Sequence, residues 1–148
     1  MSGAISLSRI WSDDDLTELR IVVAGTNSSF ANSVYVGHDA LASLVRQMLE
    51  FRCQVVGTSD IRLGAFGPEY ASGGFHAHLE FRDPGRLFVS THQQDEFQPF
   101  PHDRVANEAR LYLVSEPVLL DRFAYELQGL AGGTREEAQL LCPIAPGS

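Results

Sequence analysis

The segment from Gly73 to Gln94 constrains the fold more than any other part of this chain. Apolar and ionisable side chains alternate along its first half. Phe75, Ala77, Leu79 and Phe81 have one parity, and His76, His78, Glu80 and Arg82 have the other. Because successive side chains of a strand point to opposite faces, this pattern predicts a half-buried β-strand. Asp83-Pro84-Gly85 then leads into a second run, residues 86–94, so the whole segment predicts a β-hairpin.

Two registers of this hairpin are compatible with its turn. A two-residue loop of Pro84 and Gly85 would suit a type II turn, and it would pair Phe81 with Phe88 and His78 with Thr91. A three-residue loop from Asp83 to Gly85 matches apolar with apolar residues, so we predict the second arrangement. Its cross-strand pairs are Phe81 with Leu87, Leu79 with Val89, and His76 with His92.

The remaining elements follow from the same periodicities. Alternating residues predict strands at 5–11, 18–24, 33–37, 60–66 and 107–114. Helical spacing of apolar residues predicts a helix from Asp39, as N-cap, to about residue 52, and a second that is capped by Ser115 and ends at Gly132-Gly133. Thr134 and Glu137 have the spacing of a capping box, which predicts a short helix through residue 141.

These elements predict a single α+β domain over residues 1–148, with a frayed tail at 143–148. The composition, 44% hydrophobic and 20% charged, is that of an ordinary globular protein. We expect one antiparallel sheet of about six to seven strands, with the two main helices packed on one face. The polar face of the sheet would then be open to water or to a partner.

The charge balance bears on the kind of partner. Eleven basic and nineteen acidic residues give a formal charge of −8, which argues against nucleic acid. An acidic surface favours a basic protein partner, although acidity also serves solubility alone. No secretory signal or membrane span is visible, so we expect a cytoplasmic protein with reduced thiols. Of the two cysteines, Cys53 is expected to be a small buried residue.

A histidine cluster gives one functional hypothesis. In the predicted register His76, His78 and His92 share one face with Glu80, and such a pattern can hold zinc or iron. The HxH pair resembles the metal strand of cupins. It departs from the cupin pattern because Glu80 follows too soon and the later histidine, His102, lies in a proline-rich segment. The alternative is a solvated sheet face with neutral histidines and no cofactor.

The acidic segment after the hairpin gives a second hypothesis. Asp95 and Glu96 precede two phenylalanines, Phe97 and Phe100, in a stretch that prolines stiffen. Aromatic side chains held in this way can anchor a protein partner at low entropic cost. The alternative is that both rings fold back over a sheet edge.

Two stretches resemble small bacterial proteins of unknown function, some of which are encoded near polymorphic toxin genes as immunity proteins. The stretches are the strand from Gly73 to Phe81 and the unit from Ala109 to Phe123. The resemblance implies a binding role and assigns no functional residue. We therefore predict a non-enzymatic protein-binding module, in its specific form an immunity-type inhibitor. The alternatives are a small metal-binding protein or metal-dependent enzyme, and a homodimer formed through an uncovered sheet edge.

Overall fold

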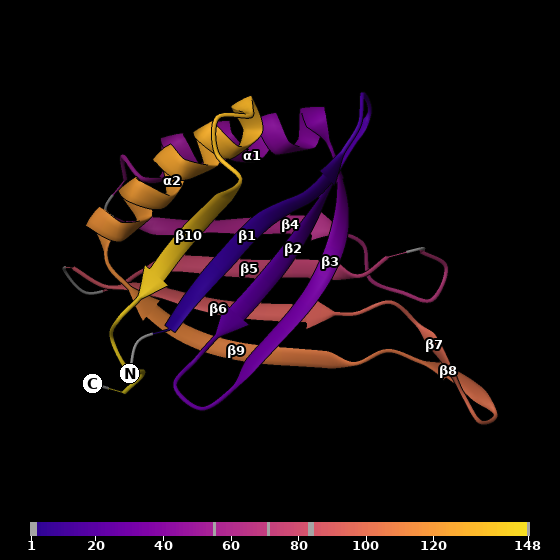
Figure 1. Ribbon diagram of the computed structural model, residues 1–148. Coiled ribbons are helices and arrows are strands. Elements are labelled where there is room, and N and C mark those ends of the chain that lie inside the picture. Colours follow the sequence, from indigo (N-terminus) through magenta and orange to yellow (C-terminus); the bar gives the residue numbers. More distant parts are fainter. Residues whose placement is uncertain (1–2, 55, 71, 83–84, 148) are drawn as a thin grey trace.

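Two four-stranded antiparallel sheets pack face to face in this computed structural model, which describes residues 3–54, 56–70, 72–82 and 85–147 (Figure 1). In spatial order, sheet A contains β10 (Glu137–Cys142), β1 (Gly3–Ser12), β2 (Leu16–Ala24) and β3 (Ser29–Gly37). Sheet B contains β4 (Gly57–Gly64), β5 (Gly74–Phe81), β6 (Leu87–Gln94) and β9 (Glu108–Ser115). A separate hairpin of β7 (Gln98–Phe100) and β8 (Asp103–Val105) projects from the body.

The prediction of a single sheet of six to seven strands is wrong, because the described residues form ten strands in three sheets. Alternation shows that one face of a strand is buried but not which layer covers it. The helices are the connections between the sheets. Helix α1 (His38–Phe51) carries the chain from β3 to β4, and α2 (Pro117–Gly132) carries it from β9 back to β10. They lie side by side along one open side of the sandwich, not over a sheet face (Figure 1).

The predicted hairpin register is confirmed. Phe81 pairs with Leu87, Leu79 with Val89, and His76 with His92. The odd-numbered side chains from 75 to 81 are buried, as predicted. Sheet A crosses this face, although the prediction placed its strands in the same sheet as the hairpin. Helix α1 reaches only the end of the face, where the Phe51 and Phe81 ring centroids lie 4.8 Å apart.

The apolar stripes of both helices are confirmed, but their predicted caps are not. Leu41, Leu44, Val45, Met48 and Phe51 of α1 are buried, as are Leu120, Phe123, Ala124, Leu127 and Leu130 of α2. The N-caps are Gly37 and Glu116, and neither forms a side-chain capping hydrogen bond. Ser115 instead donates its hydroxyl to the carbonyl oxygen of Leu141, at 2.6 Å.

The prediction of a third helix at 134–141 is wrong, because this segment forms β10. Gly133 adopts a left-handed conformation (φ 84°) and ends α2, so the chain turns back. Ala138, Leu140 and Cys142 are then buried on one parity of a strand that pairs with β1.

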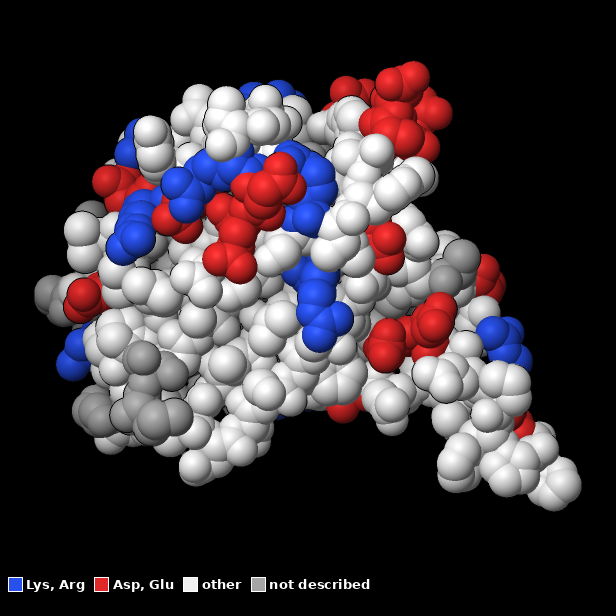
Figure 2. All heavy atoms as spheres, in the orientation of Figure 1, with Lys and Arg blue, Asp and Glu red and all other residues white. Residues whose placement is uncertain are grey.

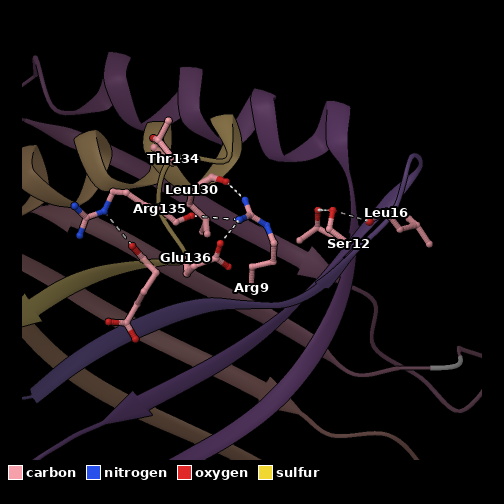
Figure 3. A network of polar contacts seen from close by, with 10 residues as sticks. Arg9, Ser12, Leu16, Leu130, Thr134, Arg135 and Glu136 are labelled. Carbon is pink, nitrogen blue, oxygen red and sulfur yellow. Dashed lines mark hydrogen bonds and ion pairs between the residues drawn. The ribbon is translucent and has the colours of Figure 1, made fainter.

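Arg9 of β1 contacts both the last turn of α2 and the segment that precedes β10 (Figure 3). Its guanidinium donates to the carbonyl oxygens of Leu130 and Arg135 and lies 3.5 Å from the Glu136 carboxylate. A cation is favourable at the carboxyl end of a helix, where carbonyl groups lack helical partners. Arg9 thereby fixes the end of α2 against sheet A.

The two cysteines lie in different surroundings. Cys53, just beyond the end of α1, is exposed, so the prediction that it is buried is wrong. Cys142 is buried in β10, and burial raises the pKa of its thiol to about 12. The Cys142 thiol therefore stays protonated at neutral pH and is a poor nucleophile.

Candidate functional site

The β7–β8 hairpin stands out from the body, with all six of its strand residues exposed (Figure 1). Pro101 and His102 form its two-residue loop, where the fixed φ of proline suits the first turn position. Pro99 lies in β7, and proline is tolerated in a strand that has a free edge. The Asp95 amide donates to the Asn107 carbonyl oxygen at 2.9 Å and closes the base of the hairpin.

One face of this hairpin carries two exposed apolar side chains. Gln98 pairs with Val105 and Phe100 pairs with Asp103, so Phe100 and Val105 are diagonal neighbours on the same face. Phe100 is 66% exposed and Val105 is 40% exposed. Together with Gln98, Pro99 and Asn107 they line a hollow of about 360 Å³. Phe97, in contrast, is half-buried near the base of the hairpin.

Acidic side chains lie on this face and beside it, since Asp103 is the cross-strand partner of Phe100. Asp95 and Glu96 directly precede β7, and the span from Asp95 to Glu108 contains four acidic residues and one arginine, Arg104. Figure 2 shows acidic side chains gathered where the hairpin leaves the body. The hairpin therefore presents an exposed aromatic ring within negatively charged surroundings.

The outer face of sheet B carries the predicted histidines. His76 and His78 both point to Asp60 of β4, whose Oδ1 atom lies 2.8 Å from His76 Nε2 and 3.0 Å from His78 Nδ1. Burial raises the pKa of Asp60, but the hydrogen bonds from both imidazoles, with the charges of His78 and Arg62, outweigh burial and lower it overall. Asp60 is thus ionised at neutral pH and accepts from both rings.

His92 lies opposite His76 in the β5–β6 pair, but it contacts a different carboxylate. Its Nε2 atom lies 2.7 Å from Glu108 Oε1, and its ring stacks on Phe66 with a centroid separation of 4.7 Å. Across the described ranges of the chain, no three His, Cys, Asp or Glu residues are arranged to hold a metal ion.

Neither α1 nor α2, the helices in the described ranges, has the length and apolarity of a membrane span.

Sequence reasoning missed Asp60 and Glu108 as partners of the histidines. The predicted strands at 60–66 and 107–114 start at or next to these residues, but their registers against the hairpin were not assigned. The observed pairing places Asp60 opposite His78. It places Glu108 two residues before Arg110, the cross-strand partner of His92, and so on the same face. Cross-strand pairing of opposite charges was the signal that could have identified them.

Comparisons with known proteins do not assign this chain to a family. No protein-family model and no curated protein sequence matches the chain. Among solved structures, one chain of the "CdiA-CT/CdiI toxin and immunity complex from Enterobacter cloacae" is similar, with 12% sequence identity and a TM-score of 0.45. The similarity covers 87% of this chain and 99% of that chain. We draw no argument from a likeness at this level.

Proposed function

We propose that this protein is a protein-binding module that docks on a basic partner through the β7–β8 hairpin. The observation that carries the proposal is Phe100, a large aromatic side chain that is 66% exposed on an element projecting from the body. Exposed aromatic residues cost solvation free energy unless a partner covers them, and they are common anchors of protein interfaces. The short connection through Pro101 limits the entropy that binding would cost.

The charge of the hairpin supports a basic partner. Asp95, Glu96 and Asp103 lie in or next to the hairpin, within a chain of formal charge −8. Complementary charge accelerates encounter and disfavours acidic competitors. The affinity of the complex should therefore fall as salt is raised, because ions screen the rim charges. The specific form of the proposal is an immunity-type inhibitor of a basic toxin, which follows the sequence resemblance alone.

Site-specific photo-crosslinking tests the proposal. The chain has no lysine, so lysine-directed reagents cannot map the surface. A benzophenone amino acid is placed at position 100, and a control protein carries it at position 125, where the tyrosine of α2 is 70% exposed. Irradiation in the source organism should cross-link one basic protein from position 100 and not from position 125.

Three outcomes contradict the proposal. They are no cross-link from position 100, the same products from both positions, and a cross-link from position 100 to a second copy of this chain. The last of these would favour the homodimer alternative.

A further inference from the structure

Three chemically complementary side chains form a row across sheet B, away from the hairpin. Asp60 of β4 lies opposite His78 of β5, and His78 lies opposite Ser90 of β6. Their chain neighbours Ile61, Leu79 and Val89 are buried. Because side chains alternate between faces, Asp60, His78 and Ser90 all lie on the outer face of the sheet.

The hydrogen bond between His78 and Asp60 determines which ring nitrogen of a neutral His78 carries the proton. His78 Nδ1 lies 3.0 Å from Asp60 Oδ1, and the ionised Asp60 carboxylate can only accept a hydrogen bond. The proton of a neutral His78 is therefore on Nδ1. Its Nε2 atom carries the free lone pair, which is the tautomer that a general base needs beside a hydroxyl nucleophile.

Ser90 is the hydroxyl next to that base. It is half-buried, and its hydroxyl forms no hydrogen bond to any residue in the described ranges. The Cβ atoms of directly opposite residues in an antiparallel pair are about 4.5–5.5 Å apart, so rotation about the Ser90 Cα–Cβ bond brings Oγ toward the ring of His78. Such bonds are often long without substrate and shorten when substrate binds.

A pocket of about 240 Å³ opens at this row. Its volume is below the ~300–1,000 Å³ of pockets for drug-sized ligands, so it suits a small acyl group. Tyr112, the cross-strand neighbour of Ser90 on β9, also lines this pocket, and a phenol hydroxyl is a donor of the kind that stabilises an oxyanion. His78, Ser90 and Tyr112 are among its lining residues.

We infer that Ser90, His78 and Asp60 form a hydrolytic site for esters of small acyl groups. Ser90 Oγ attacks the ester carbonyl carbon while its proton passes to His78 Nε2. The tetrahedral intermediate collapses, the bond to the leaving oxygen breaks, and His78 returns the proton to the departing alcohol. Water then attacks the acyl-serine and gives a proton to His78, which passes it to Ser90 as the carboxylic acid leaves. Asp60 is a positioning residue.

Hydrolysis of p-nitrophenyl acetate by the full chain tests the inference. Ser90→Ala and His78→Gln should each lower kcat/KM about a hundredfold, in the range of general base catalysis. Asp60→Asn should lower kcat and leave KM unchanged while the midpoint of urea unfolding stays that of wild type, and Asp60→Glu should restore part of the rate; a loss of folded protein would instead move that midpoint. Mass spectrometry of the wild-type protein quenched during turnover should find the acetyl group on Ser90.

Matched variants separate this site from other surface histidines and serines. His92→Gln removes an imidazole from the same face, and Ser33→Ala removes a half-buried hydroxyl of β3 on sheet A. Both should keep the wild-type rate. Phe100→Ser should also keep it, so failure of the hydrolytic site and failure of the hairpin proposal are distinguishable. Unchanged hydrolysis by Ser90→Ala, or acetyl groups on residues other than Ser90, would overturn the inference.

Discussion

Asn32 places a polar side chain at the interface between the two sheets. It is 3% exposed, and its amide donates to the carbonyl oxygens of Gly74 and Gln94 at 3.1 and 2.9 Å. Gln93, also buried, donates to Asn32 Oδ1 at 2.9 Å and to the carbonyl oxygen of Ile21. These bonds join sheet A to sheet B at defined positions, and a buried polar network of this kind favours one arrangement of the core.

Replacing this amide should therefore destabilise the fold. Asn32→Ala removes one of the two acceptors of the Gln93 amide and the side-chain donor to two buried backbone carbonyl oxygens, so the free energy of unfolding should fall by about 3 kcal/mol. Urea denaturation of Asn32→Ala and of Asn27→Ala, which changes an exposed asparagine in the β2–β3 turn, makes the comparison. The control should stay within about 0.5 kcal/mol of wild type. Equal, small losses in both would mean that the inter-sheet bonds contribute little.

The elements show how far periodicity predicts this fold. The β5–β6 register and both helical stripes were predictable, because each depends on residues close in sequence whose apolar pattern is unbroken. The division into two sheets was not predictable, because it depends on which strands pair with the strand that follows each helix. Residues 134–141 show the same limit: a capping-box spacing predicted a helix, but Ala138, Leu140 and Cys142 fill a gap beside β1.

The same limit applies to the candidate sites, where local patterns identify single residues but not their partners on other strands. The histidines and Phe100 could be singled out from the sequence, since alternation and local composition mark them. Asp60 and Ser90 could not be joined to His78, because that requires the registers of three strands together. The β7–β8 hairpin lies in the segment that was expected to be a proline-rich loop, since three-residue strands with a proline give no clear period.

The junction of α2 and β1 gives a test at the level of elements. Arg9, 15% exposed, is held by charge-assisted hydrogen bonds at the end of α2. Arg9→Ala should lower the free energy of unfolding by about 1.5–3 kcal/mol. Arg20→Ala on the exposed face of β2 should change it by less than about 0.5 kcal/mol. Thermal and urea unfolding check both, and an Arg9→Ala protein as stable as wild type would exclude this role.

At the scale of the whole molecule, the two proposed activities lie on different parts of the fold. The hairpin extends from the body beside one end of sheet B (Figure 1). The Ser90 row lies on the outer face of that sheet, since its chain neighbours are buried. The sandwich core involves neither Phe100 nor Ser90. Substitutions at either position should therefore change function without unfolding the protein, which makes the two proposals separately testable.

Calorimetric titration of the partner cross-linked at position 100 tests the central proposal most directly. Phe100→Ser should weaken the affinity at least thirtyfold, as expected for an aromatic residue at an interface hot spot, about 2 kcal/mol or more. Tyr125→Ser, which removes an equally exposed aromatic ring from α2, should bind as wild type does. Unchanged affinity of a folded Phe100→Ser protein, or an equal loss in both variants, would contradict docking through the hairpin.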